Sequence, residues 1–193
     1  MSLRRSRRFP LRSLALLAVV ALCVSSFVGG CSTTYPARDP LGERLPDVEA
    51  KTLEGDALAL PGDLAGAPAI LLVGYKQRAQ FDLDRWWMGL QQAEVKVTVI
   101  EVPTIPALVP TLISGWIDEG MRAGIPEEGW GVVATLYGDS AEPVARFTGN
   151  EGGNNARVLA LDGSGQVIWF TDRGYSAGQA LELAELLEGM VGE

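Results

Sequence analysis

Ala69-Ile70-Leu71-Leu72-Val73-Gly74-Tyr75 is the stretch of sequence that decides the fold. It is an uninterrupted apolar run that begins directly after Gly66-Ala67-Pro68. A short apolar run without polar alternation indicates a strand that is buried on both faces. Such strands occur mainly in parallel sheets that carry helices on both faces, so the run predicts the central strand of an α/β sheet.

The segments after this run alternate between helix and strand patterns. Asp82 is placed to cap a helix, whose apolar side consists of Leu83, Trp86, Trp87 and Leu90. Residues 95–100 are rich in β-branched side chains and predict a second strand, which completes a right-handed βαβ unit. Residues 132–137 predict a third strand. The second helix, expected after Pro106, has an apolar side made of Leu108, Leu112, Trp116, Ile117 and Met121.

The C-terminal part carries the clearest local pattern. Residues 156–161 and 166–170 are apolar and flank Asp162-Gly163-Ser164-Gly165, which predicts a β-hairpin with glycine where positive φ is required. Ser176 and Gln179 have the spacing of a capping box at the start of a last helix. The side of that helix expected to be buried consists of Ala180, Leu183, Ala184 and Leu187.

The first 31 residues have the pattern of a bacterial export signal. Five arginines between Arg4 and Arg12 precede an apolar run from Leu14 to Val24, and Val28-Gly29-Gly30-Cys31 follows. A cysteine directly after two glycines resembles the lipobox of bacterial lipoproteins. In that family the cysteine receives lipid, including palmitate, and becomes the first residue of the mature protein. The resemblance therefore implies lipidation of Cys31.

This resemblance divides the chain into three parts: a signal peptide at residues 1–30 that is removed, a lipidated cysteine with a flexible tether at 31–44, and one domain at 45–193. It places the protein in the cell envelope. Ser32 after the cysteine favours the periplasmic face of the outer membrane in a source with two membranes. An uncleaved anchor helix and a twin-arginine export route, suggested by residues 6–12, remain alternatives.

Charge limits the classes of partner. Removing residues 1–30 takes away five arginines and no acid, which leaves 11 lysines and arginines against 24 acids and a net charge of −13. Such a surface repels polyanions, so nucleic acid is not an expected partner. We expect the membrane contact to come from the lipid on Cys31, and the functional partner to be a protein of the envelope.

The order strand, helix, strand, helix, strand, hairpin, helix resembles the thioredoxin-like superfamily, and more narrowly its redoxin branch of peroxiredoxins and thiol reductases. Leu45-Pro46-Asp47 and residues 53–56 resemble the short N-terminal hairpin of that branch, and residues 161–169 resemble its last hairpin. The implied fold class is α/β: a thioredoxin-like mixed sheet flanked by helices, with an N-terminal hairpin and a C-terminal hairpin and helix.

Two departures from the redoxin pattern decide the functional interpretation. Redoxins place a reactive cysteine at the start of the helix after the first core strand, whereas this chain has residues 75–82 there without cysteine. Redoxins also place a cis-proline before the hairpin, where this chain has Asn154-Asn155. Thiol chemistry by the family mechanism is therefore not expected. A weaker likeness, around residues 158–169, is to cysteine-free ATP synthase assembly factors, which serve as a precedent for a non-catalytic binding or assembly module.

The chain also lacks residues that other catalytic arrangements require. The chain has no histidine, which excludes Ser-His-Asp and Cys-His sites, and we expect no metal and no cofactor. Ligands of open α/β sheets bind beyond the carboxyl ends of the parallel strands. The ligand-binding candidates at that end are Tyr75, Gln77, Arg78, Gln80, Arg85, Asn154 and Asn155. An exposed polar loop without function, a small anionic ligand and a non-thiol enzyme remain alternatives for these residues.

Overall fold

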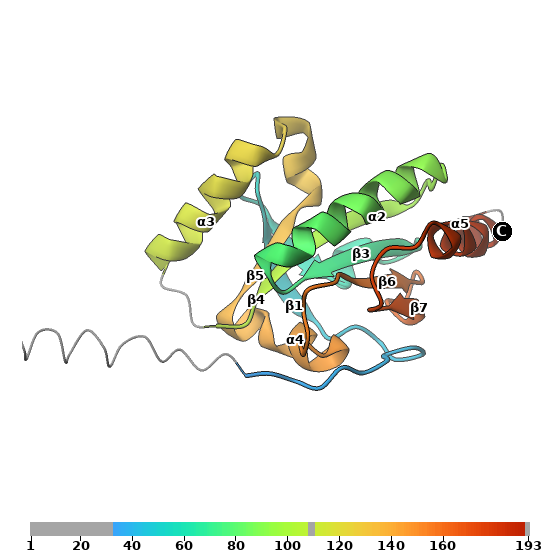
Figure 1. Cartoon of the computed structure of the whole chain (residues 1–193), viewed down its shortest axis with the longest axis horizontal. Coiled ribbons are helices and arrows are strands. Elements are labelled where there is room, and N and C mark those ends of the chain that lie inside the picture. The colour runs from blue at the N-terminus through green and yellow to red at the C-terminus, as the bar shows by residue number, and fades with distance from the viewer. Residues whose placement is uncertain (1–32, 108–110, 192–193) are drawn as a thin grey trace, which may run out of the picture. The chain divides into compact units, whose positions relative to one another are not determined.

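The computed structural model describes residues 33–107 and 111–191. These residues form a seven-stranded sheet with the order β2-β1-β5-β4-β3-β6-β7 (Figure 1). The strands are β1 (Val48–Thr52), β2 (Ala57–Leu60), β3 (Ala69–Gly74), β4 (Thr98–Ile105), β5 (Ala134–Tyr137), β6 (Arg157–Leu161) and β7 (Val167–Thr171). β3, β4 and β5 are parallel, and the hairpins β1–β2 and β6–β7 extend the sheet antiparallel on either side. The predicted mixed sheet with a hairpin at each end is confirmed.

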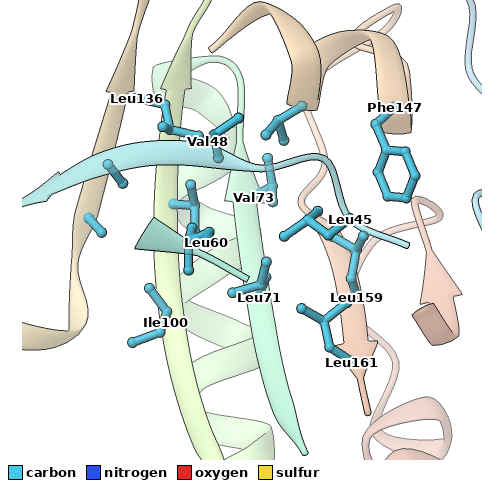
Figure 2. Close-up of a cluster of buried hydrophobic side chains, with 14 of the residues drawn as sticks. Leu45, Val48, Leu60, Leu71, Val73, Ile100, Leu136, Phe147, Leu159 and Leu161 are labelled. Atoms are coloured by element: carbon cyan, nitrogen blue, oxygen red, sulfur yellow. The ribbon is translucent and has the colours of Figure 1, made fainter. Parts of the chain in front are cut away.

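β3 is an interior strand of the sheet, as expected for a strand whose residues are all apolar or glycine. Each of them is buried, and the strand pairs with β4 on one side and β6 on the other. Leu71 and Val73 point into a cluster on one face of the sheet (Figure 2). Ile70 and Leu72 point into a second cluster on the opposite face. The uniform apolar run therefore supplies both halves of the core.

Four helices flank the sheet: α2 (Gln80–Gln92), α3 (Thr111–Gly124), α4 (Glu142–Thr148) and α5 (Ala177–Val191). α2 and α5 pack against Ile70 and Leu72 through apolar side chains that include Trp86 and Leu183. α4 lies against the opposite face of the sheet through Val144 and Phe147. In the described part of the chain, no helix is long and apolar enough to span a membrane.

Several local predictions differ from the structure. β4 begins at Thr98, because the preceding residues close α2, where the Val95 N–H donates to the Leu90 carbonyl (3.1 Å). Ser176 and Gln179 do not form a capping box, since the Gln179 amide donates instead to Thr171 (3.1 Å). α4 was not predicted. It is only seven residues long and begins with Pro143 in its first turn, so it shows too few turns for a helical period to be visible in the sequence.

Asp82 does not cap α2, because the helix begins two residues earlier, at Gln80. The Asp82 side chain is buried and accepts hydrogen bonds from the backbone N–H groups of Ala156 (2.9 Å) and Tyr175 (2.7 Å). One carboxylate thus ties the first turn of α2 to the start of β6 and to the loop before α5. This arrangement aligns three segments that are distant in sequence.

Residues 33–44 are not the flexible tether that the sequence predicted. They run extended along the domain below α4, and we call them the N-terminal strap (Figure 1). At one end of the strap, the Tyr35 carbonyl accepts from the N–H groups of Asn150 (3.2 Å) and Glu151 (3.0 Å). At the other end, the Gly42 N–H donates to the Val167 carbonyl (2.8 Å). Backbone pairing, which side-chain patterns do not reveal, therefore fixes the segment.

Candidate functional site

The carboxyl end of β3 meets the loop of residues 149–156, which joins α4 to β6. A Cβ atom on Gly153 would lie 3.0 Å from the Tyr75 Cβ atom, so the loop backbone packs directly against the residue that follows β3. Asp82 adds the bond to Ala156 from the first turn of α2. The structure thus places the end of β3, the start of α2 and this loop together, as the topology predicted. Ligand binding at that place remains a prediction.

Tyr75 is held inside the domain. Its hydroxyl donates to the Val144 carbonyl (3.0 Å) and shares a hydrogen bond with the Thr148 hydroxyl (2.6 Å), both on α4. Burial raises the pKa of Tyr75 far above its usual range, although the bond to Thr148 and the positive charge of Arg157 act in the opposite direction. Tyr75 therefore fastens β3 to α4 and is a poor candidate for contact with a ligand.

Gln80 and Asn155 are also engaged in contacts that turn them away from a common site. The Gln80 amide donates to Asp84 (3.0 Å) and to Glu101 (3.3 Å) on β4. The Asn155 amide donates to the Asp172 carbonyl (3.3 Å) after β7. Glu101 is buried and also accepts from the Trp87 indole N–H (3.0 Å). Burial raises the pKa of Glu101, although its hydrogen bonds with Trp87 and Gln80 act in the opposite direction.

Five of the predicted residues are exposed: Gln77, Arg78, Gln80, Arg85 and Asn154. Gln77 and Arg78 lie in a short 3-10 turn (Gln77–Ala79) before α2, next to the exposed Lys76. The exposed Asn154 directly follows Gly153, whose backbone packs against Tyr75. We call Lys76, Gln77, Arg78 and Asn154 the β3-end surface. These four exposed residues lie next in sequence to Tyr75 and Gly153, and ligand binding by the predicted set remains a prediction.

Arg157 is a structural residue of this region that sequence reasoning missed. Its side chain is buried, and its guanidinium donates to the carbonyl groups of Gly149 (3.2 Å), Glu151 (2.7 Å) and Asn155 (3.1 Å). The same group lies over the Tyr75 ring, 5.8 Å from its centroid. Planar guanidinium groups suit several fixed acceptors at once. Arg157 therefore holds the loop of residues 149–156 in shape, and an arginine inside an apolar strand pattern was its only signal.

Three grooves on the described part of the chain are lined by residues outside the β3-end surface. One, of about 450 Å³, lies between the strap and β7 and is lined by Ala37, Arg38, Thr171 and Glu182 among others. A second, of about 440 Å³, lies beside α4, and a third, of about 280 Å³, lies between the end of α2 and α5. No predicted site residue lines any of the three. Within residues 33–107 and 111–191, no group of three or more His, Cys, Asp or Glu residues could hold a metal ion.

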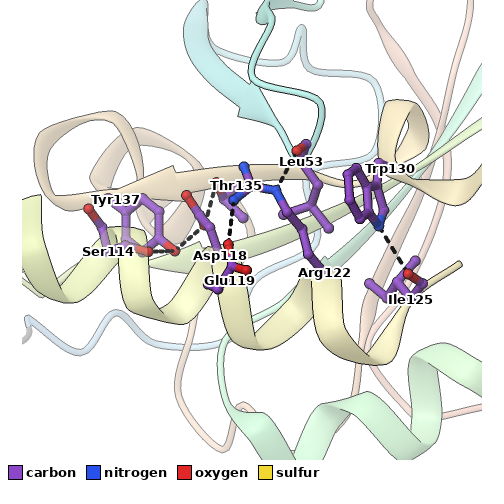
Figure 3. A network of polar contacts seen from close by, with 9 residues as sticks. All are labelled: Leu53, Ser114, Asp118, Glu119, Arg122, Ile125, Trp130, Thr135 and Tyr137. Carbon is purple, nitrogen blue, oxygen red and sulfur yellow. Dashed lines mark hydrogen bonds and ion pairs between the residues drawn. The ribbon is translucent and has the colours of Figure 1, made fainter. Parts of the chain in front are cut away.

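α3 differs from the other helices because it is attached through polar contacts (Figure 3). The Tyr137 hydroxyl donates to Asp118 (2.7 Å), and the Arg122 guanidinium donates to the Leu53 carbonyl (2.7 Å). No side chain from residue 113 to 124 is buried. Trp116, which belongs to the apolar side of the predicted helix, is 77% exposed, and Ile113 is 49% exposed. Thr135 and Tyr137 on β5 meet this helix through polar contacts with Asp118, and the apolar Trp116 stays exposed.

Comparison with known proteins identifies the fold. No protein-family model matches the chain, and no curated protein matches it. The chain is 15% identical to a candidate protein disulfide isomerase from Bacteroides thetaiotaomicron, with a TM-score of 0.55 over 81% of this chain and 94% of that chain. It is 14% identical to copper-bound yeast Sco1, with a TM-score of 0.53 over 81% and 96% of the two chains.

A third similar structure is a SCO1/SenC family lipoprotein from Bacillus anthracis. It is 13% identical, and its TM-score of 0.52 refers to 79% of this chain and 99% of that one. At such low identity these similarities concern the fold alone. The mixed seven-stranded sheet with flanking helices described above is consistent with that fold. Residues 45–191, as far as they are described, therefore form an α/β domain with a thioredoxin-like fold.

Proposed function

We propose that this protein is a lipid-anchored module of the bacterial cell envelope whose thioredoxin-like domain binds a protein partner and carries out no thiol chemistry. One observation carries the proposal. The β3-end surface occupies the place where redoxins hold their reactive cysteine, and it presents an ammonium, a guanidinium and two amides. The neighbouring Tyr75, Asp82 and Asn155 are fixed in internal hydrogen bonds. This surface suits polar recognition and offers no thiolate.

The anchoring part of the proposal rests on Val28-Gly29-Gly30-Cys31, which lies outside the described residues. The similarity of the domain to a SenC lipoprotein supports an envelope location. Ser32 favours the outer membrane in a source with two membranes. Removal of residues 1–30 would take Cys23 away, and lipid on Cys31 would leave the mature chain without a free thiol.

Copper binding, known for the Sco1 structure, is not part of the proposal. Copper is held in proteins mainly by thiolate, thioether and imidazole ligands. This chain has no histidine, both of its cysteines lie in the N-terminal segment, and its four methionines, at positions 1, 88, 121 and 190, do not form a sequence motif. The residues present therefore do not fit a copper site, and what the fold shares with such proteins in our proposal is the presentation of a surface to a protein partner.

Site-specific photo-crosslinking in native membranes tests the partner surface. A photoreactive residue at Arg78 should capture one protein, whereas the same residue at the exposed Lys96, at the amino end of β4, should capture none. Equal capture from both positions would overturn the proposed surface. Capture from position 116 alone would assign partner binding to the exposed apolar side of α3 instead.

A thiol assay tests the absence of redox chemistry. The purified lipidated protein should neither reduce insulin disulfides nor consume peroxide, because the thiolate is the reactive species in both reactions. Turnover above that of the Cys31→Ser protein would contradict the proposal. Saturable binding of inorganic phosphate that is lost in Arg78→Gln would instead favour the alternative of a small anionic ligand.

A further inference from the structure

We propose that the N-terminal strap orients the domain, so that the loop of residues 149–156 and the β3-end surface face a lipid bilayer. The proposal rests on the lipid anchoring proposed above. It adds that the chain after Cys31 is a short segment held against the domain and not a flexible linker. The surface that meets the bilayer is then set by where the strap is docked.

The first part of the argument is how firmly Tyr35 is held. The Tyr35 N–H donates to the Asn150 side-chain oxygen (2.7 Å), and the Tyr35 hydroxyl donates to Glu142 (2.5 Å). The Asn150 amide donates in turn to the Thr33 carbonyl (3.1 Å). The Arg146 guanidinium lies over the Tyr35 ring, 5.4 Å from its centroid. With the two backbone bonds to its carbonyl, Tyr35 is bound through its main chain, its hydroxyl and its ring.

The strap also has a matching surface beneath it. Gly149 has φ +70°, and a Cβ atom at this position would overlap the Pro36 carbonyl oxygen. The strap backbone can therefore pass over Gly149 only because that residue has no side chain. Arg38 lies over the Phe147 ring at 5.8 Å, and Leu45, at the end of the strap, is 1% exposed. Contacts along its whole length fix the course of the strap.

The short length of chain between Cys31 and the docked Tyr35 limits how the domain can be oriented on the membrane. Cys31 is four residues before Tyr35, and four residues span at most about 14 Å. If residues 31–44 were free, the same lipid could lie up to about 50 Å from the domain when extended, or about 20 Å away as a coil. Docking of Tyr35 therefore keeps the lipid within one short segment of Asn150 and Glu151. The domain has too little slack to present its opposite end to the membrane.

The end that is held near the lipid is the carboxyl end of the parallel strands. Asn150 and Glu151 belong to the loop that Arg157 clamps and that packs on Tyr75 through Gly153. Lys96 lies at the amino end of β4 and therefore at the opposite end of the sheet. The β3-end surface would thus meet a partner at the level of the bilayer, such as the membrane-proximal part of an envelope protein.

Single-cysteine labelling of the full lipidated chain tests this orientation, since lipid on Cys31 leaves no other thiol. Glu151→Cys and Lys96→Cys, each carrying a fluorophore, are placed on vesicles of phosphatidylethanolamine and phosphatidylglycerol that contain a quencher on the headgroup. We expect quenching to be several-fold stronger at position 151 than at 96. Adding Tyr35→Ala and Asn150→Ala should reduce that ratio toward one, and Thr34→Ala, at the exposed neighbouring position, should preserve it.

The possible failures are distinguishable. Protein that does not bind the vesicles would refute lipid anchoring, and the orientation would fall with it. Protein that binds but is quenched equally at 151 and 96 would overturn the orientation and leave anchoring intact. If the double variant does not fold, Asn150→Ala alone can be used. It removes the side-chain bonds to the Tyr35 N–H and the Thr33 carbonyl, keeps the backbone bond to the Tyr35 carbonyl, and should lower the ratio by a smaller factor. An unchanged ratio in a folded Asn150→Ala protein would count against the strap.

Discussion

The Asp82 carboxylate lies 2.9 Å from the backbone nitrogen of Ala156, across 74 residues of sequence. With the second bond to the Tyr175 N–H, it satisfies two backbone donors at the meeting point of α2, β6 and α5. Asp82→Ala removes both acceptors and leaves two poorly solvated N–H groups without partners. Each such group costs roughly 1–3 kcal/mol. Urea unfolding of the variant should therefore show a loss of about 2–4 kcal/mol.

Asp84→Ala is the matched control for this change. Asp84 is exposed on the same helix, where it accepts a hydrogen bond from the exposed side chain of Gln80 (3.0 Å). Exposed substitutions of this kind change stability by about 0.5 kcal/mol or less. Similar losses in the two variants would show that the Asp82 hydrogen bonds contribute little beyond the removal of a helical acid.

Glu101 should make stability depend on pH. Because burial raises its pKa, the folded protein holds this proton at pH values where the unfolded chain has released it. The favourable contribution of protonated Glu101 is complete below the usual glutamate pKa of about 4.3, and it is lost as pH rises through the raised value. The stability of the wild type relative to Glu101→Gln should therefore fall as pH increases from about 4, and then level off.

Urea unfolding of both proteins between pH 4 and pH 8 measures this difference. Glu188→Gln, at an exposed position on α5, controls for the loss of one negative charge. If the stability of the wild type relative to Glu101→Gln stays constant or increases as pH rises, the proposed effect of burial on Glu101 is contradicted.

The elements that could be predicted are those in which side-chain pattern and tertiary environment agree. β3 is uniformly apolar and is buried on both faces, and α5 buries the predicted Ala180 and Leu183. The elements that could not be predicted are those whose position depends on tertiary contacts. Trp116 has helical spacing with other apolar residues, but its helix faces the polar Thr135 and Tyr137. Backbone bonds to Tyr35 and the clamp by Arg157 involve carbonyl groups, which every residue has, so no sequence pattern reveals them.

Gly89 and Gly115 provide a paired test of helix packing. A Cβ atom on Gly89 would lie 2.6 Å from the Tyr175 hydroxyl oxygen, whereas one on Gly115 would meet nothing within 4 Å. Overpacking in a close-packed site costs about 1–3 kcal/mol, so Gly89→Ala should lower the midpoint of thermal unfolding. Gly115→Ala should stabilise α3 by about 0.5–1 kcal/mol, because alanine loses less backbone entropy in a helix. Equal effects of the two changes would refute the close contact of Tyr175 with α2.

α3 should open before the rest of the domain, because its described side chains are not buried and Asp118 provides its main bond to β5. Burial and the neighbouring Asp118 raise the pKa of Tyr137, so its hydroxyl remains a donor to that carboxylate at neutral pH. Asp118→Ala removes this acceptor, and we expect faster amide hydrogen exchange in residues 113–124. The amides of β3 and β6 should exchange as slowly as before, because they become accessible only when the whole domain unfolds. Glu119→Ala is the control, since Glu119 is exposed and forms an ion pair with Arg122 on its own helix. Uniformly faster exchange throughout the domain after Asp118→Ala would show that α3 unfolds together with the core. The exposed face of α3 around Trp116 would then be a rigid surface and not one that opens locally.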